Sequence, residues 1–332
     1  MKEYLVDVPV QVNIWIRAEC QRKLLKALQA ARPSTVFLVS DGGRNDAEKT
    51  LIDENRSLME NGIDWDCKVY KLYEDANRGI PGIIVLTHQF VWERVDRCIF
   101  LEDDVIPSIS FFRYCKELLE KYENDPRINV ICGMNHLGVY PDDCESDYFF
   151  SRQGSIWGYA LWKRSYQEFF DYSYEKSPYV WRCLTNNAGD DKFLLKEIKR
   201  RKADTEKLHD WSTYASPTEF FIDLTLYSQN QLQIIPRKNM VSCIGASPEA
   251  NSSDSLSRLP KSIRKLFFMK TYEIDFPIRH PRFVVPDKFY EAQRNRIICR
   301  NHPFLNIIRR FLRGWYVLKE GDFKYLWRKI KR

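Results

Sequence analysis

The stretch Cys98–Phe112, CIFLEDDVIPSISFF, joins a short apolar run to three consecutive acids, Glu102, Asp103 and Asp104. The apolar run predicts a buried strand, and the Pro-Ser pair at Pro107 predicts that a helix starts soon after. At the end of a fixed strand, three carboxylates repel one another and cannot separate by flexing of the backbone. The stretch therefore predicts that a cation is held at the end of this strand.

Segments of strand and helix character alternate through the first half of the chain. This alternation implies right-handed crossovers and a mainly parallel sheet covered by helices on both faces. Residues 136–218 are richer in Tyr, Trp, Asp and Ser, as expected of loops and short helices that shape a site on a rigid scaffold. The expected strands are 8–16, 35–40, 67–72, 97–102, 128–135 and 232–236, and the expected helices are 20–31, 83–95 and 219–231.

Ligands of parallel sheets bind at the carboxyl ends of the strands. This rule places Arg17, Asp41, Asn77 and the acidic triplet on one rim. Carboxylate oxygens suit Mg²⁺ or Mn²⁺, and Mg²⁺ usually takes one or two carboxylates together with substrate phosphates. The triplet thus fits a metal–diphosphate site. Acids are also favoured at the N-terminus of a following helix, and the triplet alone does not decide between the two interpretations.

Composition and charge narrow the class of protein. The 332 residues are 44% hydrophobic and 14% aromatic, which predicts a folded chain with one large or two modest cores. The net charge of +7 belongs to the tail, because residues 301–332 carry nine Lys or Arg and two Asp or Glu. Residues 1–300 are therefore neutral, which argues against nucleic acid as the partner.

The same sequence predicts a cytoplasmic location. It has no run of eighteen apolar residues and does not start with a basic region followed by an apolar one, so neither a spanning helix nor a secretory signal is expected. Nine cysteines are scattered without metal-ligand or paired spacing, which is typical of reduced thiols.

The order of these segments resembles the nucleotide-sugar domain of GT-A-fold glycosyltransferases, most closely the N-acetylglucosaminyltransferase-I-like group and bacterial HlpA-like sugar transferases. The resemblance rests on IWIRAECQRKLLKALQAARPSTVFLVSDGGR, on a loop with Asn77, and on FLEDDVIPSISFFRYCKELLEKYENDPRINVICGMN. It covers residues 8–255 and implies a GT-A fold, a Rossmann-like mainly parallel α/β sheet flanked by helices, with a C-terminal helical basic extension. The implied units are a nucleotide-sugar half (1–135), an acceptor half (136–255) and an extension (256–332).

The resemblance also implies roles for single residues. Asp104, the last acid of the Asp-x-Asp-type motif, would ligate Mn²⁺ or Mg²⁺ held by the diphosphate of a UDP-sugar. Arg17 and Asp41 would contact the nucleotide base, since a guanidinium and a carboxylate suit the edge of a uracil. Besides Asp104, the positions that match the family's residues for binding the nucleotide-sugar donor are Arg17, Asp41, Asn77, Arg78, Glu102 and Asp103.

On the acceptor side, GSIWGYALWKRSY resembles a family segment that borders both substrates, so Trp157 and Tyr159 are expected as walls and Asn135 beside them. Both aromatics are equally compatible with a core position. Inverting transfer needs a carboxylate that removes the proton of the acceptor hydroxyl. The resemblance gives Glu219 as this base, with Asp223, Asp190 and Asp191 as rivals. Glu219 also fits the first turn of a helix after a Ser-Pro-Thr cap.

Two departures from the family pattern matter. Ser252 stands where the family commonly supplies a histidine to the metal, so the dependence on metal stays open. A nucleotidyltransferase that makes sugar nucleotides could use a similar sheet and metal, although IWIRAECQRK lacks the Gly-rich phosphate loop expected of it. A non-catalytic, membrane-associated carbohydrate-binding or scaffold protein is the third alternative.

The tail predicts a basic amphipathic helix. After a start at Asn301 and Pro303, six apolar residues share one helical face and three arginines occupy another. Such a helix can lie on an anionic membrane or pack on the domain with a solvated basic face. Taken with the tail, the resemblance implies an inverting glycosyltransferase that acts on a lipid-linked cell-surface glycan and is peripheral on the inner face of the membrane. The apolar residues are Phe304, Ile307, Ile308, Phe311, Leu312 and Trp315, and the arginines are Arg309, Arg310 and Arg313.

Overall fold

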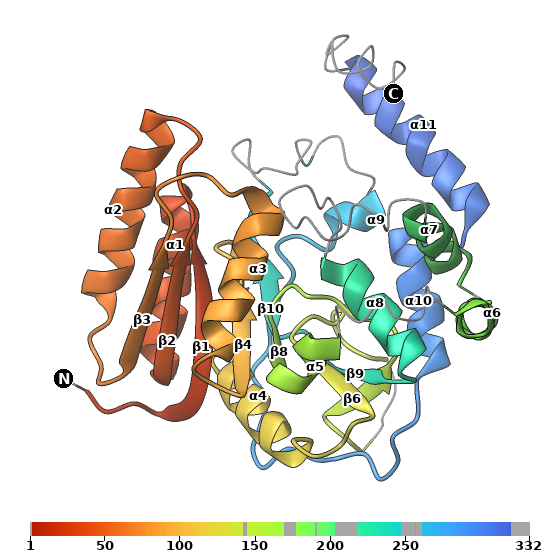
Figure 1. Ribbon diagram of the computed structural model, residues 1–332, viewed down its shortest axis with the longest axis horizontal. Coiled ribbons are helices and arrows are strands. Elements are labelled where there is room, and N and C mark those ends of the chain that lie inside the picture. The colour runs from red at the N-terminus through yellow and green to blue at the C-terminus, as the bar shows by residue number, and fades with distance from the viewer. Residues whose placement is uncertain are drawn as a thin grey trace.

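The computed structural model describes residues 2–141, 145–168, 177–189, 191–202, 218–246, 256 and 261–319, with the side chains of 200–202, 218–221, 310, 313, 316 and 317 left aside. Its first half alternates strands and helices around a central sheet (Figure 1). The elements of this half are β1 (Val6–Ile14), α1 (Ala18–Ala31), β2 (Pro33–Ser40), α2 (Asp46–Gly62), β3 (Lys68–Tyr73), α3 (Gly79–Trp92), β4 (Arg97–Leu101), β5 (Val105–Pro107), α4 (Ser110–Lys121) and β6 (Ile128–Cys132).

The second half adds short strands and then helices. A small antiparallel pair of β5 and β10 stands beside the main sheet. The elements are β7 (Tyr148–Ser151), β8 (Tyr159–Trp162), α5 (Lys163–Glu168), α6 (Pro178–Asn187), α7 (Lys192–Lys202), α8 (Thr218–Ser228), β9 (Leu232–Pro236), β10 (Val241–Cys243), α9 (Lys261–Arg264), α10 (Lys288–Ile298) and α11 (Pro303–Lys319).

Within the described residues the main sheet has eight strands in the order β3-β2-β1-β4-β8-β6-β9-β7. Strands β1 to β4 pair in parallel, as do β6 and β9, whereas β7 and β8 run antiparallel to their neighbours. The fold is therefore a mixed α/β fold with a mainly parallel sheet flanked by helices, which confirms the expected class. The four-residue strands β7 and β8 are too short for a periodic signal, which is why the sequence did not predict them.

Strand β1 lies at the centre of the parallel part, and its alternation explains its two faces. Val8, Val10 and Val12 are fully buried and share one core cluster with Leu24 and Leu28 of α1. Because successive side chains of a strand point to opposite faces, the residues between these valines face α3 instead. Strand β1 therefore buries valines in the apolar core on the α1 face and turns Pro9 and Gln11 toward α3 on the other face.

Helix α3 starts earlier than the sequence predicts. The predicted helix begins at Ile83, but the observed one begins at Gly79. The Asp41 carboxylate at the end of β2 accepts hydrogen bonds from the backbone N–H groups of Arg78 (2.8 Å) and Gly79 (3.0 Å). Since the first N–H groups of a helix have no partner within it, an acceptor from a neighbouring strand lets the helix begin there.

The C-terminal segment packs along the second half and then leaves it. Asp287 caps α10 by accepting from the N–H of Tyr290, and Tyr290 is fully buried against the sheet. Helix α11 projects away from the body at the upper right (Figure 1). Among the described residues, no helix combines the length and the apolar character needed to cross a bilayer. The eight cysteines described are free thiols.

Candidate functional site

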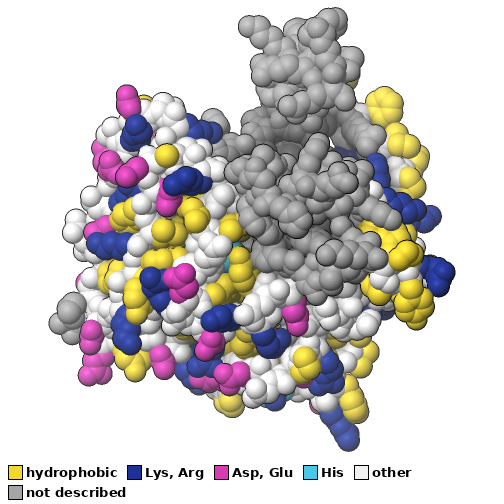
Figure 2. Space-filling view, in the orientation of Figure 1, with side chains coloured by type: hydrophobic (Ala, Val, Ile, Leu, Met, Phe, Trp, Pro, Cys, Tyr) yellow, Lys and Arg dark blue, Asp and Glu magenta, His cyan; other side chains and the backbone are white. Residues whose placement is uncertain are grey.

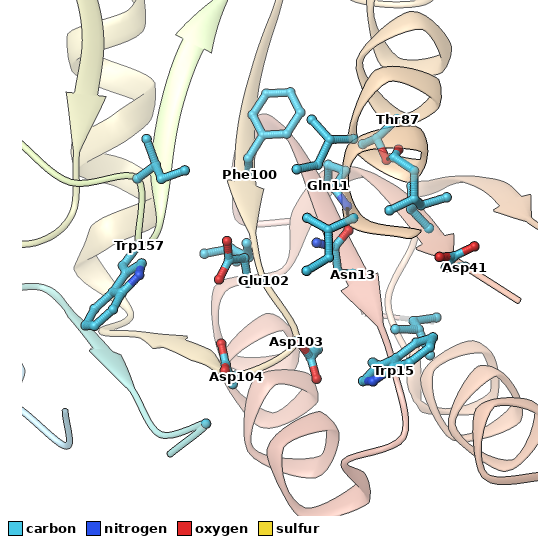
Figure 3. Close-up of a pocket in the computed structure, with 18 of the residues that line it drawn as sticks. Gln11, Asn13, Trp15, Asp41, Thr87, Phe100, Glu102, Asp103, Asp104 and Trp157 are labelled. Carbon is cyan, nitrogen blue, oxygen red and sulfur yellow. Dashed lines mark hydrogen bonds between the residues drawn. The ribbon is translucent and has the colours of Figure 1, made fainter. Parts of the chain in front are cut away.

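The acidic triplet lies where the main sheet meets the β5–β10 pair. Strand β4 ends at Leu101, the triplet follows, and β5 then pairs with β10. The side chains of Asp103 and Asp104 are largely buried, with 7% and 9% of each residue exposed. Figure 3 shows both carboxylates below Glu102, between Trp157 and Trp15. The tertiary structure thus buries two adjacent carboxylates, which requires compensating positive charge.

Arg17 supplies that charge from the turn between β1 and α1. Its Nε and Nη2 donate to the two carboxylate oxygens of Asp103 at 2.8 and 2.6 Å, and Nη1 lies 2.8 Å from Oδ2 of Asp104. Burial lowers the pKa of Arg17, but its bonds to these acids outweigh burial and raise the pKa above its usual value. Burial also raises the pKa of Asp103, to about 6, although Arg17 acts to lower it. The cation predicted at the strand end is, within the chain, a guanidinium.

A further cation would still find a ligand here. Oδ1 of Asp104 is buried and, in the described part of the chain, has no hydrogen-bond partner. Both oxygens of Asp103 are taken by Arg17. The described residues contain no group of three or more His, Cys, Asp or Glu side chains suited to a metal. The site therefore fits a Mg²⁺ or Mn²⁺ ion that takes one carboxylate oxygen from the protein and its other ligands from phosphates and water.

A cavity of about 590 Å³ opens beside the triplet. Its lining comes from the carboxyl ends of β1, β2 and β4, from α3 and from the loop before β8 (Figure 3). This volume falls in the range of about 300–1,000 Å³ that is usual for small-molecule sites. The sequence-predicted residues that line it are Arg17, Asp41, Asn77, Glu102, Asp103, Asp104, Trp157 and Tyr159.

Asp41 lines the cavity with its carboxylate already engaged. Besides the N–H groups of Arg78 and Gly79, it accepts from the N–H of Gly42 (2.9 Å) and from Nδ2 of Asn77 (3.1 Å). Burial raises the pKa of Asp41 more than these bonds lower it. Asp41 therefore fastens the Asn77–Gly79 loop to the end of β2.

The remaining predicted donor and acceptor residues separate into two groups. Trp157 and Tyr159 border the cavity, and the Tyr159 ring stacks on Phe100 with centroids 5.3 Å apart. Asn135 is fully buried instead and donates to the carbonyls of Pro236 (2.9 Å) and Arg237 (3.0 Å). Arg78 points to an exposed ion pair with Glu74 (2.6 Å). Neither Asn135 nor Arg78 lines the cavity.

Two candidates for the general base form a separate buried network. Arg300, in the turn after α10, donates to Asp191 Oδ1 (3.1 Å) and to Asp223 Oδ2 (2.7 Å). Burial raises the pKa of Asp191, but Arg300 outweighs burial and lowers it below the usual value. A carboxylate held in this way is a weak proton acceptor, and neither acid lines the cavity. Asp190, Ser252 and the side chain of Glu219 lie outside the described residues.

The structure adds three residues that the sequence did not single out. The Gly245 carbonyl, just after β10, accepts from Nη1 of Arg17 at 3.1 Å, so Gly245 lies directly over the acids. Gln11 and Asn13 of β1 line the cavity beneath α3. No local signal marks the two amides, because Gln11 and Asn13 alternate with apolar residues as in any half-exposed strand.

Two solved structures resemble this chain at low sequence identity. No family model and no curated protein matches the chain. Among solved structures, mouse xyloside xylosyltransferase 1 in its apo form aligns with a TM-score of 0.33 and 16% identity, over 55% of this chain and 76% of that one. Mannose-1-phosphate geranyltransferase from Thermus thermophilus aligns with a TM-score of 0.34 and 13% identity, over 75% of this chain and 80% of that one.

Proposed function

We propose that this protein is a glycosyltransferase that takes a sugar from a nucleotide diphosphate. The observation that carries the proposal is the buried carboxylate of Asp104, which keeps one oxygen without a partner among the described residues, where the β4 strand end meets a cavity of about 590 Å³. A free hard-oxygen ligand at the carboxyl edge of a parallel sheet suits a divalent cation and a diphosphate.

In this proposal each residue has a distinct part. Asp104 would hold Mn²⁺ or Mg²⁺, which offsets the charge of the diphosphate when it is bound. Arg17 and Asp103 would fix Asp104 in place, and Asp41 and Asn77 would form the nucleotide side of the cavity. Trp157 and Tyr159 would border the sugar.

We further propose inversion at the anomeric carbon. The acceptor hydroxyl oxygen would bond to this carbon while the bond to the diphosphate oxygen breaks on the opposite face, and a carboxylate would take the hydroxyl proton. Because Arg300 engages both Asp191 and Asp223, Glu219, which the resemblance gives, is the proposed base, and Asp190 is its remaining rival.

Calorimetric titration tests the donor site. Wild-type protein should bind UDP more tightly with Mn²⁺ than without it and should slowly hydrolyse a UDP-sugar in a donor panel. Asp104→Asn keeps the size of the side chain and should weaken Mn²⁺-dependent UDP binding at least tenfold. Asp46→Asn is the matched control, since the side chain of Asp46 is fully exposed at the start of α2.

Three results would overturn the proposal. Absence of binding to any nucleoside diphosphate, with or without Mn²⁺, would leave the scaffold alternative. Release of pyrophosphate from a nucleoside triphosphate and a sugar 1-phosphate would indicate a nucleotidyltransferase. Unchanged binding in Asp104→Asn would remove the proposed metal ligand.

We also propose that α11 places the enzyme on an anionic membrane, where a lipid-linked glycan would be the acceptor. Its apolar residues are exposed: Phe304 by 72%, Phe311 by 76% and Trp315 by 66%. Figure 2 shows hydrophobic side chains along this projecting helix. The nine basic residues after residue 300 complement anionic headgroups, each contributing about 1 kcal/mol near the surface.

Vesicle flotation tests the membrane proposal. Wild-type protein should float with vesicles of phosphatidylglycerol and phosphatidylcholine and much less with phosphatidylcholine alone, and added salt should weaken binding. Phe311→Glu should reduce flotation at least tenfold. Phe283→Glu is the matched control, because Phe283 is 67% exposed and does not belong to α11. Equal flotation of the two variants, or none of the wild type, would refute the proposal.

A further inference from the structure

Two amide side chains lie on the central strand of the sheet, beneath helix α3. Gln11 is 2% exposed and Asn13 is half-buried, and both line the cavity (Figure 3). Strand β1 has a parallel neighbour on each side, β2 and β4, so its backbone groups are taken up by the sheet. A position like this normally carries an apolar side chain. Gln11 and the half-buried Asn13 therefore present two amides to the cavity from one face of this strand, where a bound ligand can pair with them.

Within the described residues, the hydrogen bonding of the pair leaves one amide oxygen and one amide nitrogen without a partner. Nε2 of Gln11 donates to Oδ1 of Asn13 at 2.7 Å. Among the described residues, neither Oε1 of Gln11 nor Nδ2 of Asn13 has a hydrogen-bond partner. If the oxygen and nitrogen of both amides were exchanged, Asn13 would donate to Gln11 instead. One amide oxygen and one amide nitrogen would still be left without a partner. The pair therefore matches a ligand edge that offers an N–H next to a carbonyl.

The walls around the pair are apolar. Ile83 and Ile84 of α3 face the cavity from above, while Val39 of β2 and Phe100 of β4 border it from the sheet. Register places Phe100 beside Gln11, and Val39 beside Asn13. Apolar surfaces with a few placed polar groups are the usual lining of a site for a small ring system.

The same cavity reaches the acids. Gln11 of β1 pairs with Phe100 of β4. Glu102 lies two residues after Phe100, which at the usual rise of a strand is about 7 Å further along the direction of β4. Asp104, two residues beyond Glu102, lines the same cavity. A ligand with a ring at one end and a diphosphate at the other would span these two parts of one cavity.

We propose that Gln11 and Asn13 read the base of the nucleotide, and that the base is uracil. Oε1 of Gln11 accepts from the ring N–H, and Nδ2 of Asn13 donates to an adjacent ring carbonyl. This inference rests on the proposed function. It assigns base recognition to residues other than Asp41, whose carboxylate already accepts four hydrogen bonds from its own chain.

Titration of the full chain with UDP, CDP, GDP and ADP in the presence of Mn²⁺ tests the assignment. Wild-type protein should prefer UDP. Gln11→Met and Asn13→Leu each remove one polar group and should weaken UDP binding about tenfold, the equivalent of one hydrogen bond of about 1.4 kcal/mol. The variants should bind the other three nucleotides as the wild type does, so that the preference for UDP is lost. The double variant, which leaves no amide unpaired, tests the same point if a single variant does not fold.

Gln21→Met is the matched control. Gln21 is a fully buried glutamine of α1 that donates to the backbone carbonyl of Asn13 at 3.1 Å, but it does not line the cavity. It should leave the preference for UDP unchanged. Inorganic pyrophosphate with Mn²⁺ separates the two proposals, because its binding depends on the acids alone. Pyrophosphate binding without a preference for UDP, or a preference that survives the double variant, would overturn the base assignment and leave the proposed function standing.

Discussion

Replacing Gly245 with alanine should open the acid cluster. A Cβ at this position would lie 1.6 Å from Oδ2 of Asp104 and 2.4 Å from Nη1 of Arg17. Because real Cβ contacts stay beyond 3.0 Å, the carboxylate oxygen would have to move by about 1.4 Å. That movement breaks the 2.8 Å ion pair between Arg17 and Asp104. A hydrogen bond to a charged group contributes about 1.5–3 kcal/mol, so the free energy of unfolding should fall by about 2 kcal/mol.

Guanidinium unfolding and calorimetry measure the two consequences. The midpoint of unfolding should shift to lower denaturant, and the Mn²⁺-dependent affinity for UDP should fall at least tenfold because Asp104 is displaced. Gly314→Ala is the matched control, since a Cβ there would meet no atom of the described residues within 4 Å apart from its own helix backbone. Gly314 lies inside α11, where alanine is the better helix former by about 1 kcal/mol, so this variant should be as stable as the wild type or more so.

The two variants together decide whether the geometry is correct. If Gly245→Ala unfolds at the same denaturant concentration as the wild type and keeps its response to Mn²⁺, then the chain after β10 does not lie against Asp104. If it loses stability but keeps Mn²⁺-dependent binding, the close approach is correct and Asp104 is not the metal ligand.

Two further changes test the surrounding structure. Asp191→Asn breaks its ion pair with Arg300 inside the protein and should lower the free energy of unfolding by about 3 kcal/mol at pH 7. Since the native pKa of Asp191 is lowered, this stabilisation is fully present above the unfolded value of about 4 and is lost as the pH falls from there through the native value. Unfolding curves of variant and wild type should converge in acid, and a constant difference would contradict the ion-pair account. Asp41→Ala leaves the N–H groups of Arg78 and Gly79 without their acceptor and should cost about 1–3 kcal/mol. Hydrogen exchange of these two amides should accelerate, and unchanged exchange would show that another group caps α3.

Local pattern was enough to predict much of the fold. The strand prediction at 35–40 overlaps β2, and the strand at 232–236 coincides with β9. These segments carry their signal within five to eight residues of sequence, because burial and period act at short range. Strands β5 and β10 have three residues each and pair with each other across more than a hundred residues, so no local period marks them.

The candidate site shows the same division. The acidic triplet is visible in the sequence because it interrupts an apolar strand, and it does line the cavity. Gln11 and Asn13 alternate with valines in an ordinary strand pattern, so their burial beneath α3 became evident from the sheet order and the cavity. The Asn135 side chain shows the opposite case: it follows a core strand as a site residue would, yet it is fully buried in hydrogen bonds to the backbone after β9.

By itself, the sequence determined the alternation of strands and helices, the carboxyl edge on which polar side chains gather, and the basic, apolar-faced helix near its end. Tertiary structure decided which charges meet. Arg17 reaches Asp103 across 86 residues and the Gly245 carbonyl across 228, while Arg300 reaches Asp191 across 109. The physical reason is that hydrophobic periodicity is a property of neighbouring residues, whereas the pairing of buried charges depends on where distant segments come to lie once the core has packed.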